Sequence, residues 1–431
     1  MRISIDQLYA HYLEAGSVTT DTRKITPGCI FFALRGENFD GNAFSNEAIA
    51  KGARFSVVDN ASFDSGDHTI LVDDTLKAMQ KLARFHRDQL NIPVIGITGT
   101  NGKTTTKELI NAVLSRKFET IATEGNLNNH IGVPLTLLSI CKTTNIAIIE
   151  MGANHKGEIA TLCEIASPEF GIITNIGKAH LEGFGSYEGV ISTKKELFEF
   201  ISESGGQLFV NSDNDLLTQL SENISTITYG ARSGAWCHGW PEESNPFAKL
   251  RWDSPEGLLA ITTSLVGAYN FENVMAAICI GQYFGVPPME IRAAIATYHP
   301  SNNRSQIIET GNNQLIMDAY NANPTSMKAA ILNFRNLNSP SKMVILGDMF
   351  ELGNETKKEH TEIVRLLDES NFETVMLVGP RFGSVSVPQH FLSFSSTKEA
   401  TGWLGKHPYK GHTILIKGSR GIHLEDIKEA L

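Results

Sequence analysis

A short glycine loop between an apolar segment and a helix-prone segment constrains this chain more than any other feature. The loop reads Gly-Thr-Asn-Gly-Lys-Thr over residues 99–104, directly after the apolar run 94–97 and directly before residues 105–110. A strand, a glycine loop and a helix N-terminus in this order direct backbone N–H groups and the positive end of a helix dipole at one point, which suits a polyphosphate. We therefore predict that the loop binds ATP or GTP.

Within this loop, the lysine and the threonine have the most specific expected roles. Lys103 would neutralise the β and γ phosphates, and the Thr104 hydroxyl would be placed for Mg²⁺. The strict P-loop pattern has a glycine where this chain has Ile97, so a plain glycine turn between strand and helix is the alternative. The residues predicted to hold the nucleotide here are Gly99, Thr100, Asn101, Gly102, Lys103, Thr104 and Thr105.

Length and charge limit the class of protein. With 431 residues, 41% hydrophobic and 19% charged, the chain is long enough for about three domains. No stretch reaches the roughly 18 uninterrupted apolar residues of a membrane helix, and the first residues lack a signal-peptide core. We therefore expect a cytoplasmic protein without membrane insertion. The formal net charge of -10 and the lack of a long basic run argue against a nucleic-acid partner.

The cysteines do not indicate a disulfide framework or a zinc site. They lie far apart, are odd in number and include no Cys-x-x-Cys pair. We expect reduced thiols, most of them buried. The cysteines are Cys29, Cys141, Cys163, Cys237 and Cys279.

Alternating apolar and helix-prone segments predict an α/β protein of three domains. Residues 1–90 read as a small N-terminal α/β domain, 91–299 as a central P-loop-type domain with a mostly parallel sheet, and 300–431 as a doubly wound, Rossmann-like domain. The polar stretch 239–255 reads as a surface excursion. Strands are predicted at 30–34, 55–58, 94–97, 146–150, 171–174, 208–211, 314–319, 343–346, 374–378 and 413–417.

Polar residues follow several of these strands, at the sheet edge where such folds bind ligands. Glu150 ends an apolar strand beside the glycine loop, where a Mg²⁺ ligand is needed, although an acid that caps the next helix is the alternative. His180 lies in a loop after the strand 171–174, and an isolated histidine is more often structural. Lys194 and Lys195 lie on a predicted helix over 189–200 and could be a solvated face.

The order and spacing of four motifs resemble the central domain of the Mur ligases, the ATP-dependent amino-acid ligases of peptidoglycan synthesis. Further motifs near both ends resemble the member of this family whose amine substrate is a dipeptide, so the resemblance spans all three domains. The central motifs cover residues 96–105, 150–153, 175–182 and 193–198, and the others cover residues 21–24, 32–36, 318–326, 346–353 and 417–420.

The resemblance implies that a substrate carboxylate attacks the γ-phosphate of ATP to give an acyl phosphate and ADP, and that an amine then displaces phosphate to form an amide. The expected substrates are UDP-N-acetylmuramoyl-tripeptide and D-alanyl-D-alanine. Because carboxylate and triphosphate are both anions, the site needs concentrated positive charge. Lys103 and two Mg²⁺ ions would supply it.

The metal ligands are carried over from the family motifs. Thr104 and Glu150 would hold the Mg²⁺ between the β and γ phosphates, and His180 would ligate the second ion. Lys194 occupies the family position of a carbamoylated lysine, formed from CO₂, which would support the second Mg²⁺. Two exposed lysines on a helix remain the alternative. The residues implied in catalysis are Lys103, Glu150, His180, Lys194 and Arg304.

Two positions depart from the family pattern near the expected nucleotide. Tyr269 stands where histidine is usual, beside Asn270 near the adenine and Asn273, which would support it; a pair that caps the next helix is the alternative. Asn303 stands where glycine commonly precedes the arginine, and asparagine tolerates the left-handed backbone region. Arg304 would reach the ATP phosphates, or else be a solvated linker residue.

The substrate contacts are also implied by motif position. Asp318 would bind the ATP ribose, so ATP contacts from both Lys103 and Asp318 predict that domain closure assembles the site. A turn that caps the helix from Thr325 is the alternative for the residues after Asp318. The residues expected to face the dipeptide are Tyr320, Asn321 and Asn323, and those expected to bind its carboxylate are Lys417 and Arg420. The UDP moiety would be held by Thr22, Arg23 and the loop 36–41. The muramoyl substrate would lie near Asn126, Asn128 and Asn129.

Three other functions remain open from the sequence. The chain could be another Mur-type ligase that adds a single amino acid, a folylpolyglutamate-type relative, or a nucleotide-dependent regulator without ligase chemistry. A monomer is expected. Phosphate release with each acceptor distinguishes the ligases, and a Lys194→Ala variant distinguishes an enzyme from a regulator.

Overall fold

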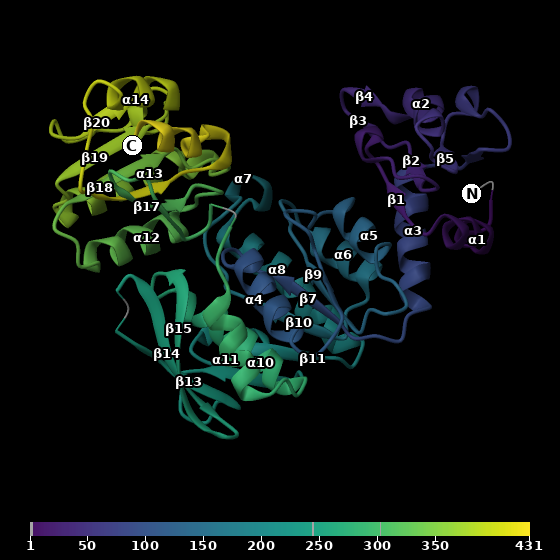
Figure 1. Ribbon diagram of the computed structural model, residues 1–431, viewed down its shortest axis with the longest axis horizontal. Helices are drawn as coiled ribbons and strands as arrows, with labels where there is room; N and C mark the ends of the chain where they lie inside the picture. Colours follow the sequence, from purple (N-terminus) through teal and green to yellow (C-terminus); the bar gives the residue numbers. More distant parts are fainter. Residues whose placement is uncertain (1–2, 244, 302) are drawn as a thin grey trace.

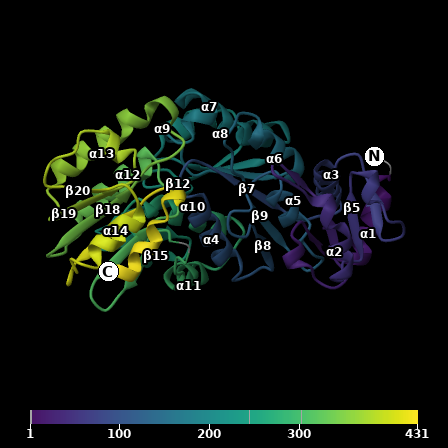
Figure 2. The same cartoon turned by 90° about the horizontal axis from the view of Figure 1, so that it is seen from above.

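The computed structural model describes residues 3–243, 245–301 and 303–431, and in this part the chain forms three lobes, each built on its own sheet. We call them the N-terminal lobe (sheet over residues 18–71), the central lobe (94–266) and the C-terminal lobe (306–417). Figure 1 shows the N-terminal and C-terminal lobes on opposite sides of the central lobe. Seen from above, the three lobes follow one another in a row (Figure 2). The predicted α/β class with a mostly parallel central sheet is confirmed.

The N-terminal lobe is a small parallel sheet in the order β1-β2-β5-β6. Strand β5 has no exposed residue, because helices cover the sheet and a parallel strand is buried on both faces. The elements are α1 (Ile5–Ala15), β1 (Val18–Thr19), β2 (Ile30–Phe32), β3 (Arg35–Gly36), β4 (Phe39–Asp40), α2 (Ser45–Ala50), β5 (Phe55–Val58), β6 (Thr69–Leu71) and α3 (Thr75–Asp88).

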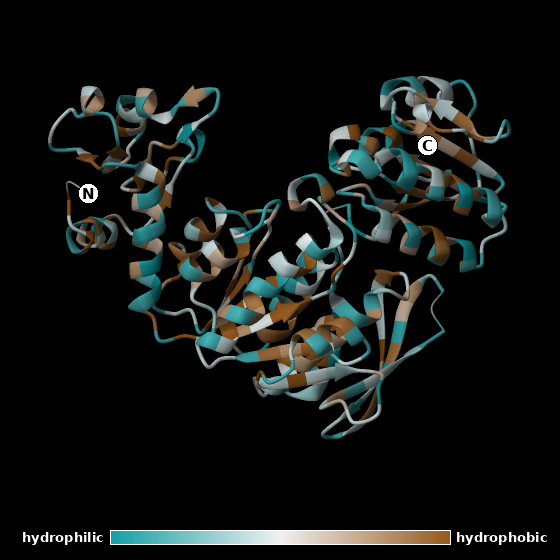
Figure 3. Ribbon diagram, turned by 180° about the vertical axis from the view of Figure 1, so that it is seen from behind, coloured by the Kyte–Doolittle hydropathy of each residue, from teal (hydrophilic) through white to brown (hydrophobic). Residues whose placement is uncertain are grey.

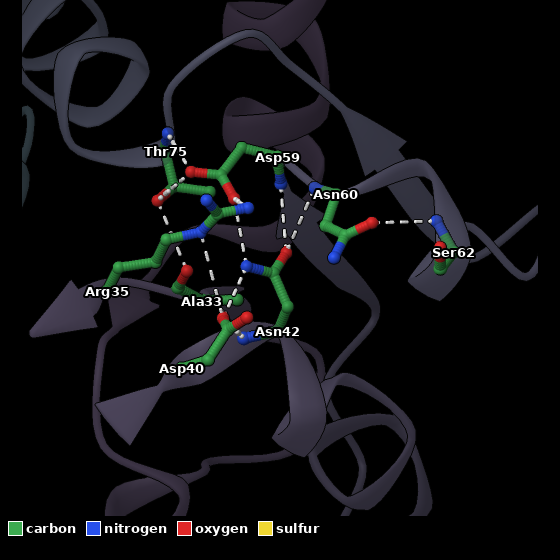
Figure 4. Close-up of polar contacts among 8 residues, drawn as sticks. All are labelled: Ala33, Arg35, Asp40, Asn42, Asp59, Asn60, Ser62 and Thr75. Carbon is green, nitrogen blue, oxygen red and sulfur yellow. Dashed lines mark hydrogen bonds and ion pairs between the residues drawn. The ribbon is translucent and has the colours of Figure 1, made fainter. Parts of the chain in front are cut away.

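A buried asparagine ties the β3–β4 hairpin to the end of β5 (Figure 4). The Asn42 amide donates to Asp40 Oδ1 at 2.7 Å and to Asp59 Oδ1 at 2.9 Å. Arg35 approaches the same Asp59 carboxylate at 2.7 Å. These charge-assisted contacts fix the loop 36–41, which lies in this hairpin.

The central lobe has the strand order β15-β14-β13-β12-β11-β10-β7-β9-β8. Strands β8 to β13 pair in parallel, whereas β14 and β15 join as an antiparallel extension. The strands are β7 (Val94–Thr98), β8 (Thr120–Ala122), β9 (Ile146–Glu150), β10 (Phe170–Ile173), β11 (Gln207–Asn211), β12 (Thr226–Gly230), β13 (Cys237–Glu242), β14 (Phe247–Ser254) and β15 (Gly257–Val266).

Helices cover both faces of this sheet. Ile95 and Ile97 of β7 pack in one cluster with α4, α10 and α11, whereas Val94 packs on the other face with α3, α5, α6 and α8. Figure 3 shows the apolar residues on the strands and on the helix sides that face them. The helices are α4 (Lys103–Leu114), α5 (Gly132–Leu137), α6 (Glu158–Ala166), α7 (Leu181–Phe184), α8 (Tyr187–Glu203), α9 (Asp215–Leu220), α10 (Asn270–Tyr283) and α11 (Pro288–Thr297).

The prediction that residues 239–255 form a surface excursion is wrong. The described residues of this segment form most of β13 and all of β14, and Trp252 of β14 is fully buried. Strand β14 alternates buried and exposed residues, and its three exposed side chains, those of Lys249, Arg251 and Asp253, are polar. Averaged over the segment, this pattern reads as polar although one face belongs to the core.

The C-terminal lobe is a second doubly wound sheet in the order β16-β17-β21-β18-β19-β20, parallel except for β16. The strands predicted in this lobe are confirmed to within a residue or so. The elements are β16 (Gln306–Glu309), β17 (Gln314–Asp318), α12 (Pro324–Asn336), β18 (Lys342–Gly347), α13 (Thr356–Ser370), β19 (Thr374–Val378), β20 (Leu392–Phe394), α14 (Thr397–Leu404) and β21 (Thr413–Lys417).

Two further expectations from the sequence concern thiols and membranes. The cysteines in the described residues are free, and all except Cys141 are buried, which confirms the expected burial. Among the described helices, none combines the length and the apolar character that crossing a membrane requires.

Candidate active site

The glycine loop joins β7 to α4 as the sequence predicts, and the two residues that follow β10 hold it in place. Gly102 is the N-cap residue of α4 and has a φ of 79°. The backbone N–H of Asn101 donates to Asn175 Oδ1 at 3.0 Å, and the Thr174 hydroxyl donates to the Asn101 carbonyl at 2.6 Å. Lys103 Nζ donates to the carbonyl of Gly99 at 2.8 Å. The loop is therefore fixed before any ligand binds.

A methyl group has no room at Gly99. Its φ is 144°, and an added Cβ would lie 2.0 Å from Thr174 Oγ1. We expect Gly99→Ala to lower the free energy of unfolding by about 1–3 kcal/mol and to raise the Kd for ATP at least about tenfold, because the loop must move. Denaturant unfolding and nucleotide titration measure this. Gly383→Ala, where a Cβ has open space, is the control, and equal Kd values for the two variants would contradict the prediction.

Glu150, at the end of β9, lies against the start of α4. Its carboxylate is 1% exposed, and Oε1 accepts hydrogen bonds from Thr104 at 3.2 Å and from Asn128 at 2.7 Å. Oε2 is buried without a hydrogen-bond partner among the described residues, although Lys107 Nζ lies 3.8 Å from it. The carboxylate thus faces the glycine loop and does not cap α6. Sequence reasoning missed Lys107, which reads as an ordinary helix lysine.

His180 precedes α7 with a φ of 50° and lines the same region. Its Nδ1 lies 2.6 Å from Oε2 of Glu351, which belongs to the C-terminal lobe. Nδ1 has no other polar partner among the described residues, so this contact is the one that can orient the ring there. The imidazole holds the pKa of the Glu351 carboxyl below its usual value. His180 is therefore held from across a lobe boundary, which the sequence did not indicate.

Lys194 is buried, so the alternative of two exposed helix lysines is wrong for this residue. Its side chain is 2% exposed, and its Nζ lies 5.6 Å from the centre of the Phe184 ring. Within the described part of the chain, its ammonium has no hydrogen-bond acceptor or ion pair. Desolvation, reinforced by the positive charge of Lys103, lowers the pKa of Lys194 to about 7. The adjacent Lys195 is partly exposed and pairs with Glu199 at 3.0 Å.

The expected adenine-side residues are connected to α4. Asn273 accepts a hydrogen bond from Thr106 at 3.1 Å and donates to Asn270 at 2.9 Å. Neither amide caps α10. The Tyr269 hydroxyl lies 2.9 Å from Ser305 Oγ, and burial raises the pKa of this tyrosine. The asparagine pair therefore stabilises the junction of α4 and α10.

Arg304 and its neighbour follow the expected backbone geometry. Asn303 adopts the left-handed conformation with a φ of 50°, so asparagine substitutes for glycine at this turn. The Arg304 guanidinium lies 3.8 Å from the centre of the Tyr320 ring, which is a cation–π contact. Arg304 is thus fixed at the entrance of the C-terminal lobe and is not a solvated linker residue.

Asp318, at the end of β17, pairs with a buried lysine on the neighbouring strand. Lys417 Nζ donates to Asp318 Oδ2 at 2.6 Å and to the Asn321 carbonyl at 3.3 Å, with Lys417 only 2% exposed. Asn323 caps α12, as the alternative from the sequence stated, and its amide also donates to Asn101 Oδ1 of the glycine loop at 2.7 Å. The exposed Arg420 lies 5.5 Å from the Tyr320 ring.

These residues surround a cavity of about 800 Å³ between the central and C-terminal lobes. Gly99, Lys194 and Arg420 do not line it, and Thr22 and Arg23 lie in the N-terminal lobe, where Arg23 pairs with Asp21 at 2.7 Å. Glu158, Asn214, Glu272 and Thr325 line it without having been predicted. The predicted residues that line it are Thr100, Asn101, Gly102, Lys103, Thr104, Thr105, Asn126, Asn128, Asn129, Glu150, His180, Asn270, Asn273, Arg304, Asp318, Tyr320, Asn321, Asn323 and Lys417.

Comparison with known proteins gives consistent results along the chain. Three family models match: the Mur ligase middle domain at residues 97–281, the glutamate ligase domain at 303–420 and the Mur ligase catalytic domain at 14–87. Two curated relatives are named UDP-N-acetylmuramoyl-tripeptide–D-alanyl-D-alanine ligase. That of Bacillus subtilis is 36% identical, covering 96% of this chain and 92% of the relative. That of Escherichia coli is 34% identical, covering 96% and 93%.

Solved structures agree with this result. MurF from Acinetobacter baumannii superposes with a TM-score of 0.87 at 30% identity, covering 99% of this chain and 98% of that one. MurF from Thermotoga maritima in complex with ADP gives a TM-score of 0.84 at 26% identity, covering 97% of each chain. A folylpolyglutamate synthase from Mycobacterium tuberculosis, at 13% identity and a TM-score of 0.63, shares the fold alone. With the cavity, the glycine loop and these matches together, the chain belongs to the Mur ligase family.

Proposed function

We propose that this chain uses ATP to join D-alanyl-D-alanine to UDP-N-acetylmuramoyl-tripeptide in peptidoglycan synthesis. Curated relatives with this name match it over almost their whole length, and a MurF structure with ADP shares its fold. The observation that carries the proposal is the cavity in which the glycine loop and Glu150 face Arg304 and Asp318 of the C-terminal side. The single-amino-acid, folylpolyglutamate-type and regulatory alternatives are not favoured.

The reaction requires two anions to approach each other. The tripeptide carboxylate forms a bond to the γ-phosphorus as the bond to the ADP oxygen breaks, and the dipeptide amine then forms the amide as phosphate leaves and the amine loses a proton. Lys103 at the start of α4 is placed to neutralise the phosphates. Desolvation lowers its pKa, with Glu150 opposing and Arg304 adding to this effect. Binding of an anion would therefore stabilise the charged lysine.

The residues at the glycine loop suit a hard cation. The buried Oε2 of Glu150 has no hydrogen-bond partner in the described chain, and the Thr104 hydroxyl lies beside the same carboxylate; oxygen donors of this kind are preferred by Mg²⁺. We propose that Thr104 and Glu150 hold one Mg²⁺ and that His180 and a carbamoylated Lys194 support a second. Bound Mg²⁺ supplies charge neutralisation and orients the phosphates.

Lys194 has the chemistry that carbamoylation needs. CO₂ reacts with a neutral amine, and burial lowers the pKa of this lysine to about 7, so a sizeable fraction is neutral under physiological conditions. The ammonium group first loses one proton, and the neutral amine nitrogen then attacks the CO₂ carbon and releases a second proton, so that overall a cation becomes an anion. Without a partner of its own, the buried amine is available for this reaction.

The lowered pKa gives a signed expectation for pH. Because protonation removes the nucleophile, we expect the carbamate at Lys194 to decrease as the pH falls from about 8 to about 6, through the pKa of about 7. With ¹³C-bicarbonate, the carbamate carbon gives a separate NMR signal. The signal should be absent in Lys194→Ala and present in Lys195→Ala. A signal that keeps its full intensity at about pH 6 would contradict the assignment.

We assign nucleotide and substrate contacts by position around the cavity. Asn270 and Asn273 would lie near the adenine, Arg304 near the phosphates and Asp318 at the ribose. Lys417 is held by Asp318, so we propose that it orients this aspartate. The exposed Arg420 would meet the dipeptide carboxylate, and Tyr320 would face the dipeptide. The dipeptide would also contact Asn321 and Asn323. The muramoyl peptide would contact Asn126, Asn128 and Asn129, and the UDP moiety would contact Thr22, Arg23 and the loop 36–41.

We also propose a separate binding role for each lobe. Residues 1–90 would bind the UDP substrate, and residues 91–299 would bind ATP. Residues 300–431 would bind the dipeptide and contact part of the ATP. The protein would act as a monomer, since residues of one chain form the whole cavity described above. It would act in the cytoplasm.

Phosphate release with defined acceptors tests the function. The purified protein is incubated with ATP, Mg²⁺ and UDP-N-acetylmuramoyl-tripeptide, and then with D-alanyl-D-alanine, D-alanine, D-glutamate or diaminopimelate. We expect phosphate release and amide product with D-alanyl-D-alanine and far less with the single amino acids. Release with a single amino acid and not with the dipeptide would contradict the proposal, as would binding of ATP without release.

A further inference from the structure

The segment 178–182, which includes His180, contacts the C-terminal lobe. The described residues place three side-chain contacts between them: the Lys178 backbone N–H with Thr325 Oγ1 at 3.3 Å, Lys178 Nζ with Glu359 Oε1 at 2.8 Å, and His180 Nδ1 with Glu351 Oε2 at 2.6 Å. Of the two ion pairs, only that with Glu351 reaches a side chain that lines the cavity. Both contacts join a basic side chain of the central lobe to a glutamate of the C-terminal lobe, but only the contact of Glu351 involves a residue of the cavity.

The loop that presents Glu351 is built to be rigid. The fully buried Asp348 carboxylate accepts hydrogen bonds from the backbone N–H groups of Arg381 and Phe382, both at 2.9 Å. Arg381 donates to the Met349 carbonyl at 2.7 Å. The backbone N–H groups of residues 348 to 350 also have acceptors, namely the Val378 carbonyl, His360 Nε2 and Ser419 Oγ. The backbone directly before Glu351 is therefore held in one conformation by hydrogen bonds.

The backbone at Glu351 is in an unfavourable region for its residue type. Its φ is 62°, a left-handed conformation that residues other than glycine rarely adopt. Its carbonyl accepts a hydrogen bond from the N–H of Glu182 at 3.3 Å, so the strained turn lies directly on the His180 segment. Strain that is held in place by surrounding contacts is typical of positions with a functional constraint.

We propose that Glu351 is a positioning residue that the C-terminal lobe contributes to the central lobe. The carboxylate holds a proton on Nδ1 of His180 and fixes the ring, which leaves Nε2 as the acceptor atom toward the cavity; in the described chain Nε2 has no hydrogen-bond partner. Because the contact crosses the lobe boundary, His180 is oriented only when the two lobes are closed. The inference rests on the proposed function and deepens it, since it couples arrival of the dipeptide lobe to assembly of the phosphoryl site.

The matched control is the neighbouring pair between the same two lobes. Glu359→Ala removes the contact with Lys178 and leaves His180 untouched. If Glu351 only holds the lobes together, Glu351→Ala and Glu359→Ala should act alike. If Glu351 orients His180, Glu351→Ala should lower kcat by about tenfold or more, as loss of a residue that orients a ligating histidine typically does. Glu359→Ala should change kcat by less than about fivefold.

The direct readout is the imidazole itself. In protein labelled with ¹⁵N-histidine, with the His180 signals assigned by their absence in His180→Gln, we expect Nδ1–H and unprotonated Nε2 shifts in the wild type and in Glu359→Ala. Glu351→Ala should shift both signals toward their tautomer average, and Glu351→Gln, whose amide oxygen still accepts from Nδ1–H, should restore them in part together with kcat. Unchanged His180 signals in Glu351→Ala, or equal kcat losses in Glu351→Ala and Glu359→Ala, would overturn the inference.

The two proposals fail separately in this design. If the wild type released no phosphate with D-alanyl-D-alanine, the proposed function would fail, and the ¹⁵N comparison of the same variants would still decide whether Glu351 orients His180.

Discussion

Replacing Lys103 by methionine should lower the rate of ADP formation by about 10²–10³-fold, the usual loss when one charged donor at a developing anion is removed. Lys103 is the first residue of α4 and lies in the cavity with Glu150 and Arg304. Methionine keeps the length and apolar character of the chain, so packing is preserved while the charge that meets the triphosphate is lost. A phosphate-release assay at saturating ATP measures the change.

The same variant should not unfold the protein. Desolvation lowers the pKa of Lys103, which means that burial of its charge works against folding in the absence of ligand. Methionine cannot make the hydrogen bonds of Lys103 to the carbonyls of Gly99 and Thr100, but it also avoids the cost of burying the charge. We therefore expect the denaturation midpoint of Lys103→Met to stay close to that of the wild type. A variant that loses activity together with stability would show that the lysine is structural, and full activity in a folded variant would contradict its role.

Lys194→Ala should also reduce turnover by about 10²–10³-fold, because it removes the group proposed to support the second Mg²⁺. The buried amine has no partner in the described chain, so its removal leaves no unpaired group behind, and nucleotide binding at the glycine loop should persist. Measured kcat should fall while the Kd for ADP changes little. Lys195→Ala, one residue away and paired with Glu199 at 3.0 Å, is the matched control.

A small carboxylate offers a second check on Lys194→Ala. If the carbamate is what matters, acetate or formate should enter the space left by the side chain and restore part of the activity, whereas chloride at the same ionic strength should not. Equal turnover in Lys194→Ala and Lys195→Ala would contradict the assignment.

Local sequence signals predicted the parts of the site whose residues follow one another in the chain. The run 99–104 and its flanking segments specify a strand, a turn and a helix within one window, and the structure has them in that order. The ends of β9 and β17 were predicted for the same reason, since an apolar run that stops at an acid marks the carboxyl edge of a parallel sheet.

Contacts between distant residues could not be predicted in this way. Lys417 pairs with Asp318 because β21 lies beside β17 in the sheet, and that strand order is not visible in either segment. Glu351 meets His180 only because two lobes dock. The burial of Trp252 was missed because β14 exposes every second residue, which makes a half-buried strand resemble a polar loop.

In the proposed mechanism, the central and C-terminal lobes surround the triphosphate in one cavity. A crystal structure with a non-hydrolysable ATP analogue, Mg²⁺ and UDP-N-acetylmuramoyl-tripeptide tests this arrangement most directly. We predict the γ-phosphate at the N-terminus of α4 beside Lys103, with Mg²⁺ on Thr104 and Glu150 and with Arg304 and Asp318 in contact with the nucleotide. A nucleotide bound elsewhere, or a γ-phosphate remote from the Glu150 carboxylate and the His180 imidazole, would contradict the account.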